Sequence, residues 1–163
     1  MNFQELFERA MKRRLPRLID IEGVGLDIGS SGTYKVPGSM ALGLPEWNFP
    51  RDKIPVDDAS VQTIHCYHFL EHLTGDNAIL FLREVERVLV VGGIMNYCMP
   101  YYNSNLWAHD LTHKSQWNED SFQNLFKNEY YDPAGSWRLE VHFQIICGIV
   151  ERNMALIGQL RKV

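Results

Sequence analysis

The chain has 163 residues, a length that suits a single domain over residues 1–163 with a real hydrophobic core. Its 45% hydrophobic and 22% charged residues are ordinary for a globular protein. The net charge of −4 argues against nucleic-acid binding, and no apolar run reaches the roughly 20 residues that a membrane span requires.

The three cysteines, Cys66, Cys98 and Cys147, are far apart and odd in number. Two of them lie in apolar runs typical of strands, so we expect buried free thiols in a reducing compartment rather than disulfides. The N-terminal segment lacks the apolar stretch of a secretory signal. These features predict a cytoplasmic protein.

Residues 1–15 are predicted to form an amphipathic helix that ends before Pro16. If this helix is exposed, its aromatic face would give a contact for a homodimer. The apolar residues of that face are Phe3, Leu6, Phe7, Ala10 and Met11.

Residues 24–28 and 39–44 are short apolar runs that predict buried strands. Between Pro45 and Asp58 the chain is rich in Pro, Asp, Arg and Asn, which is typical of a surface loop. Residues 61–67 predict another strand.

The period of the apolar residues changes over 78–90, where they recur at helical spacing. Thr74 or Asp76 can cap the start of this helix. The Gly92-Gly93 pair is predicted to end the helix, because glycine tolerates left-handed backbone angles.

The second half begins with a predicted strand over 94–99, followed by a long polar and aromatic loop over 101–117. Residues 118–128 predict a short helix, and 137–147 and 153–161 predict two adjacent strands. This order of elements predicts an α/β fold with a mostly parallel sheet that ends in an antiparallel hairpin.

Four local patterns follow one another: LDIGSSG at 26–32, KIPVDDASVQTIHCYHFLEHL at 53–73, FLREVERVLVVGGIMNYCMP at 81–100 and HDLTHKSQWNEDSF at 109–122. Together they resemble the class I S-adenosylmethionine-dependent methyltransferases, and most of all the methyltransferase type 11 group. The resemblance implies a Rossmann-like three-layer sandwich in which the first helix–strand unit is abbreviated. It also implies S-adenosylmethionine as the cofactor and a small molecule as the methyl acceptor.

In such methyltransferases the loop after the first strand holds the methionine end of the cofactor. The resemblance therefore assigns cofactor contacts to Asp27, Gly29 and Ser31, and Gly29 lets a ligand approach the backbone closely. The chain departs from the pattern because serine and threonine replace later glycines, and Pro37 comes too early for the usual helix. The alternative is a tight turn that merely needs a glycine.

The resemblance also assigns Asp52 to the adenine amino group, and Cys66 and Tyr67 to the strand edge that faces the sulfonium. An acidic residue usually ends the second strand and binds the ribose hydroxyls. Gly43 occupies that place here, and Glu46 could replace the acid only by an irregular path.

His68 is the predicted general base, with the alternative that it lines the pocket without proton transfer. Because the Glu71-His72 pair opens a helix, Glu71 is expected to satisfy free amides or the helix dipole. His109 and His113 are expected to bind the acceptor, with a self-capped loop as the alternative.

A metal site competes with this interpretation, because the pairs His68/His72 and His109/His113 have i, i+4 spacing and could supply four nitrogen ligands. The HExxH order is absent, so no metal site is predicted.

The predicted function is methyl transfer from S-adenosylmethionine to an oxygen or nitrogen of a small-molecule or sugar-like acceptor. Two alternatives remain open. One is a catalytically inactive binding protein with this fold, and the other is different chemistry on the same cofactor or a related nucleoside.

Overall fold

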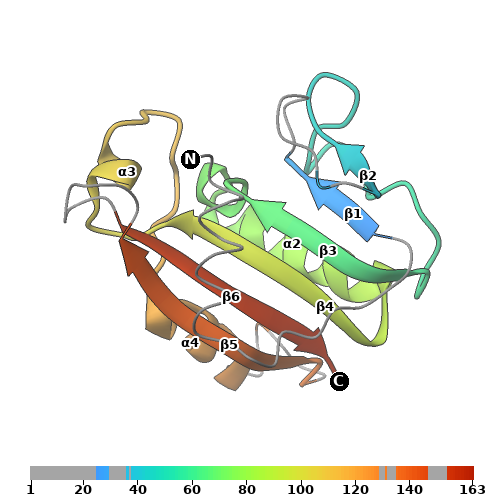
Figure 1. The fold of residues 1–163 in the computed structure, drawn as a ribbon. Helices are drawn as coiled ribbons and strands as arrows, with labels where there is room; N and C mark the ends of the chain where they lie inside the picture. Colours follow the sequence, from blue (N-terminus) through green and yellow to red (C-terminus); the bar gives the residue numbers. More distant parts are fainter. Residues whose placement is uncertain (1–24, 30–35, 37, 129–130, 132–134, 147–153) are drawn as a thin grey trace.

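The computed structural model describes residues 25–29, 36, 38–128, 131, 135–146 and 154–163 (Figure 1). The predicted N-terminal helix, Ser31 and Cys147 lie outside the described residues, so those predictions stay open.

A six-stranded sheet of order β2-β1-β3-β4-β6-β5 forms the centre of the molecule (Figure 1). Strands β1 to β4 are parallel, whereas β6 runs antiparallel to both β4 and β5. This arrangement confirms the predicted parallel sheet with a terminal antiparallel hairpin. The strands are β1 (Gly25–Ile28), β2 (Ser39–Leu42), β3 (Val61–Tyr67), β4 (Leu89–Pro100), β5 (Trp137–Ile146) and β6 (Met154–Lys162).

The connection between β1 and β2 is unusually short for two parallel neighbours. It comprises only residues 29–38, whereas a crossover between parallel strands usually takes about a dozen residues or more. The predicted abbreviation of the first helix–strand unit is therefore confirmed.

The described helices are η1 (Leu70–His72), α2 (Gly75–Val88), α3 (Asn105–Ala108) and α4 (Glu119–Lys127). Of the two predicted caps, Thr74 caps α2, because its hydroxyl accepts a hydrogen bond from the Asn77 amide. Helix α3 lies within the segment that the sequence predicts as a loop, and Ser104 caps it.

The prediction that Gly92-Gly93 ends the helix is wrong. Helix α2 ends at Val88, and β4 begins directly at Leu89. Gly92, with φ +84°, lies inside β4, opposite the place where the pairing with β3 shifts register between Val61 and Thr63. The glycines therefore accommodate an irregularity of the strand.

Both faces of the sheet are buried. Helices α2 and α4 cover one face, where the Tyr97 ring of β4 lies 4.6 Å from the Phe122 ring of α4. On the opposite face Ile94, Cys98 and Ile157 are at most 1% exposed. This burial is what a three-layer sandwich requires, and Cys66 and Cys98 are buried thiols as predicted.

A row of polar side chains crosses that opposite face. Asp27, His65, Asn96 and Gln159 occupy paired positions on β1, β3, β4 and β6. The Gln159 amide donates to Asn96 Oδ1 over 2.7 Å, and Asn96 Nδ2 lies 3.4 Å from His65 Nδ1. Burial lowers the pKa of His65 to about 4. The His65 ring is therefore neutral near pH 7.

Candidate functional site

The carboxyl ends of β1 and β3 meet at one edge of the sheet, because the two strands are parallel neighbours. Each of these strands is followed by a residue in the left-handed region, Gly29 with φ +81° and His68 with φ +52°. A histidine at positive φ is uncommon, and such residues concentrate at functional sites.

Gly29 is held between two neighbouring segments. Its amide donates to the Leu42 carbonyl of β2 over 2.8 Å. A Cβ atom at this position would lie 3.0 Å from the Cβ of Phe69, a tight contact that requires Phe69 to shift by a few tenths of an ångström. Phe69 in turn packs its ring 5.8 Å from the Trp47 ring. The glycine is therefore needed for local packing, whatever contact it makes with a ligand.

The two carboxylates assigned to cofactor binding, Asp27 and Asp52, accept hydrogen bonds from nearby residues. Asp27 is 3% exposed, and its Oδ2 accepts a hydrogen bond from the Val36 amide. Asp52 accepts from the Asn48 amide and forms a two-pronged ion pair with Arg51. The hydrogen bonds from Arg51 and Asn48 lower the pKa of Asp52, so this carboxylate is charged and keeps the loop folded.

At the end of β3, Cys66 and Tyr67 point to opposite faces of the sheet. The Cys66 thiol is 1% exposed in the core, and burial raises its pKa. Only the main chain of Cys66 is thus available to a ligand. The Tyr67 hydroxyl lies 3.0 Å from His65 Nδ1 and extends the polar row to the carboxyl edge.

Glu71 has a different environment from the one predicted. Its side chain is fully buried, and its Oε1 lies 3.1 Å from His68 Nδ1. Its Oε2 has no hydrogen-bond partner among the described residues. Of the two expected roles, hydrogen bonding to free helix amides is therefore wrong, because Oε1 instead contacts the His68 imidazole. The role at the helix dipole stays a prediction, since Glu71 lies in the first turn of η1.

The loop after β4 folds back onto η1. The amides of Lys114 and Ser115 both donate to the Glu71 carbonyl. His109 is exposed, with Nδ1 on the Asn105 carbonyl, whereas the His113 side chain is only 4% exposed. The two rings, which the sequence assigns to the acceptor, lie 6.2 Å apart.

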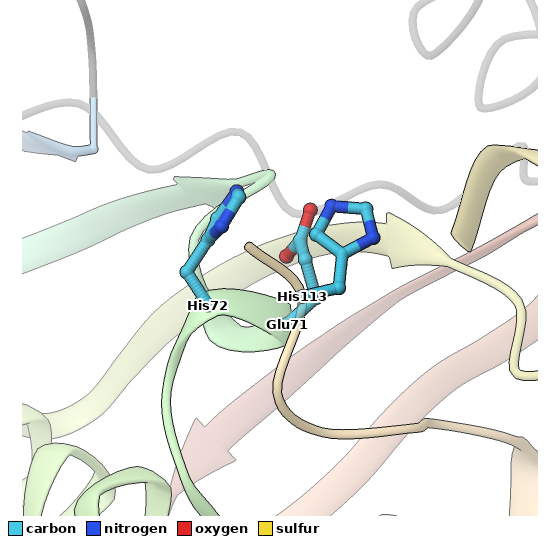
Figure 2. Close-up of side chains that lie close together, drawn as sticks. All are labelled: Glu71, His72 and His113. Atoms are coloured by element: carbon cyan, nitrogen blue, oxygen red, sulfur yellow. The ribbon is translucent and has the colours of Figure 1, made fainter. Parts of the chain in front are cut away.

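In the structure His113 lies beside Glu71 and His72 (Figure 2). This cluster differs from the i, i+4 histidine pairs that the sequence suggests as metal ligands. One ligand atom from each of these three residues lies within 4.8 Å of the others. Figure 2 shows the Glu71 carboxylate between the two imidazole rings. The sequence singled out His113 for the acceptor and His72 as one member of a possible pair of metal ligands, but it did not place Glu71 with them, because only the fold brings the three residues together.

Residues 48–96 match the family described as "Methyltransferase domain". The match spans β3, η1, α2 and the first part of β4, and so includes His68, Glu71 and His72. No protein of curated function matches this sequence.

Solved structures resemble the chain over almost its whole length. An S-adenosylmethionine-dependent methyltransferase from Archaeoglobus fulgidus is 13% identical with a TM-score of 0.62, and the alignment covers 98% of this chain and 94% of that one. A methyltransferase from Thermotoga maritima is 16% identical with a TM-score of 0.64, with 99% and 90% covered. The 1,6-didemethyltoxoflavin-N1-methyltransferase of Burkholderia thailandensis, solved with S-adenosylhomocysteine, is 10% identical with a TM-score of 0.60, with 97% and 75% covered.

The fold of the chain is therefore the Rossmann-like fold of S-adenosylmethionine-dependent methyltransferases. Its resemblance to the methyltransferase type 11 group, predicted from four sequence patterns, is confirmed by the match over residues 48–96. Among the helices that the structure describes, none combines the length and apolar character needed to cross a membrane.

Proposed function

We propose that this chain is an S-adenosylmethionine-dependent methyltransferase that acts on an oxygen or nitrogen of a small-molecule or sugar-like acceptor. The observation that carries the proposal is the pair of left-handed turns at Gly29 and His68, side by side at one sheet edge of this fold. Ligands of open parallel sheets bind at the carboxyl ends of the strands.

When bound, S-adenosylmethionine supplies a methyl carbon activated by a positively charged sulfur. In our proposal the turn after β1 holds one end of the cofactor and the loop before β3 holds the other. Cys66 contributes through its main chain, because its thiol is buried. The proposed cofactor contacts are Asp27, Gly29, Ser31, Asp52, Cys66 and Tyr67.

The chain's own groups position the acceptor for in-line attack on that carbon. His68 is held by its Nδ1 contact with Glu71 and accepts the hydrogen bond of the acceptor O–H or N–H through its other nitrogen. His109 and His113 bind the acceptor from the loop that follows β4, which the Glu71 carbonyl holds against η1.

Calorimetric titration with S-adenosylhomocysteine tests the cofactor site directly. We expect affinity near micromolar for the wild type, a loss of at least tenfold for Asp52→Ala, and no change for Asp57→Ala, an acid of the same loop. Circular dichroism should show that both variants are folded. Absence of binding at millimolar ligand would overturn the proposal.

The alternative is an inactive protein of this fold that binds a partner. One observation favours it, since Gly43 directly follows β2 where such methyltransferases carry an acid, and Glu46 lies exposed beyond it. Under this alternative S-adenosylhomocysteine gives no heat, so the same titration separates the two functions.

The role of His68 is tested by the rate of S-adenosylhomocysteine release with a panel of phenols, sugars and amines. We expect His68→Ala to lower kcat by about 100-fold on an active acceptor, within the range typical for loss of a proton-accepting group. The affinity for S-adenosylhomocysteine should stay unchanged. An undiminished kcat would remove His68 from the mechanism.

A further inference from the structure

We infer that Glu71, His72 and His113 form a binding site for one divalent transition-metal ion, and that the methyl acceptor is a hydroxyl compound whose oxygen occupies an open position on that ion. The second half of this inference rests on the proposed methyltransferase function. The first half depends only on the three side chains and on the groups around them (Figure 2).

The buried carboxylate of Glu71 is the first observation. The side chain is fully buried, and Oε2 lacks a hydrogen-bond partner among the described residues. A buried carboxylate oxygen without a partner is costly, and buried charges are normally paired or bound to a metal. A cation beside Oε2 would remove this cost.

The histidine tautomers are the second, independent observation. His113 Nδ1 lies 2.8 Å from the Trp107 carbonyl, which can only accept, so Nδ1 carries the proton. His72 Nδ1 lies 3.0 Å from Thr112 Oγ1. The Thr112 hydroxyl already donates to Asp110 Oδ1 over 2.7 Å, so it accepts from His72.

Both rings in their neutral form therefore carry the lone pair on Nε2. Metal-binding histidines usually donate their other ring N–H to a carbonyl, a carboxylate or water, which fixes the ring and its tautomer. The Trp107 carbonyl does this for His113, and the Asp110–Thr112 pair does it for His72.

The spacing of the three groups suits one ion after a small adjustment. The ligand atoms lie within 4.8 Å of one another, whereas bonds of roughly 2.0–2.2 Å in a tetrahedral site bring ligands to about 3.4 Å. The side chains would have to move by roughly an ångström to close this gap. Asp110 Oδ2, 3.8 Å from His113 Nε2, adds negative charge that favours a cation.

Two imidazoles and one carboxylate suit ions such as Zn²⁺, Co²⁺ or Mn²⁺. Three protein ligands leave a position open, as in catalytic rather than structural sites. Because Glu71 also contacts His68 over 3.1 Å, the ion would lie beside the proposed acceptor position. A hydroxyl oxygen bound there would pass its proton to the free ring nitrogen of His68 more easily, since the cation stabilises the oxyanion.

The transfer step then balances for a hydroxyl acceptor. The oxygen attacks the methyl carbon, the new O–C bond forms as the C–S bond breaks, and sulfur keeps the electron pair. An amine gains nothing from the ion, because metal binding would occupy the lone pair that it needs for attack. The site therefore favours oxygen over nitrogen as the acceptor atom.

Titration of chelator-treated protein with Co²⁺, followed by visible absorption, tests the metal site without any cofactor. We expect one Co²⁺ per chain, displaced by Zn²⁺, and at least 100-fold weaker binding in Glu71→Gln and His113→Gln. His109→Gln, which changes an exposed histidine of the same loop, should keep the wild-type affinity. Absence of a Co²⁺ spectrum in excess metal, or equal affinity in all three variants, would overturn the inference.

Two further variants exclude a purely structural explanation. Thr112→Val removes the acceptor for His72 Nδ1 and should weaken Co²⁺ binding about tenfold, whereas Thr112→Ser should restore it. Glu71→Gln removes a buried charge, so the melting temperature of its metal-free form should equal or exceed that of the wild type. A large fall in that temperature would assign Glu71 to structure alone.

The proposed methyltransferase function and the proposed metal site can be disproved independently of each other. If S-adenosylhomocysteine binds and Co²⁺ does not, the methyltransferase function stands and the metal site falls. If Co²⁺ binds and S-adenosylhomocysteine does not, the metal site stands and its role in methyl transfer falls. If both bind, amines that react as fast as phenols or sugars would overturn the preference for oxygen.

Discussion

At the scale of single residues, a comparison of two glycines distinguishes the cost of a left-handed backbone from the cost of a steric clash. Gly29 and Gly38 have nearly the same φ, +81° and +80°. A Cβ atom would lie 3.0 Å from Phe69 at the first position and meet nothing within 4 Å at the second. Only Gly29 is therefore required by its surroundings as well as by its dihedral angle.

We expect Gly38→Ala to lower the free energy of unfolding by about 1–2 kcal/mol, the cost of a left-handed residue that is not glycine. Gly29→Ala should cost about 2–4 kcal/mol, because overpacking against Phe69 adds to the same backbone term. Urea denaturation of the two variants measures the difference. Equal losses would show that Phe69 moves aside freely.

At the scale of elements, one arginine ties the loop before β3 to helix α2. Arg87 donates to the carbonyls of Ile54 and Val56, and it also pairs with Asp58 and Glu84. The hydrogen bonds that Arg87 donates to Glu84 and Asp58 raise the pKa of Arg87. This one side chain therefore fixes the path of the segment that enters β3.

Arg87→Ala should lower the free energy of unfolding by about 2–3 kcal/mol, since it leaves the partly buried carbonyls of Ile54 and Val56 and the partly buried Glu84 carboxylate without their donor. Arg83→Ala changes an exposed arginine one turn earlier in α2 and should stay within about 0.5 kcal/mol of the wild type. Thermal or urea unfolding measures both variants. A loss for Arg87→Ala no greater than the loss for Arg83→Ala would contradict the role of this anchor.

At the scale of the whole molecule, the polar row couples stability to pH. The pKa of His65 is lowered by burial to about 4 in the folded protein, against 6.5 for the free side chain. Asp27 faces it from β1, Asn96 faces it from β4, and Tyr67 lies on its own strand. Between these two pKa values the unfolded chain binds the extra proton, so stability falls as the pH falls from about 6.5 to 4.

His65 should therefore contribute a loss of about 2 kcal/mol between pH 7 and pH 5, and about 3 kcal/mol by pH 4. Above pH 7 it contributes no pH dependence. Urea unfolding of the wild type and of His65→Gln across this range isolates the effect, because other acids titrate in both proteins. If the free energies of unfolding of the two proteins changed with pH in parallel, the contribution assigned to His65 would be contradicted.

Local sequence patterns were enough for much of the architecture. Alternating and helical apolar spacing predicted β3, α2, α4 and the final hairpin to within a few residues, because these elements bury faces that the residues themselves define. The four ordered patterns predicted the methyltransferase fold, and the fold places Gly29 and His68 at one sheet edge.

Only the tertiary structure determines where the candidate functional side chains come together. Thr112 orients His72 from 40 residues away in the chain, and burial leaves Glu71 Oε2 without a partner among the described residues. Gly92 likewise lies in a strand rather than at a helix end, because pairing with β3 continues past it. Burial and pairing depend on contacts between distant segments, and local periodicity carries no record of those contacts.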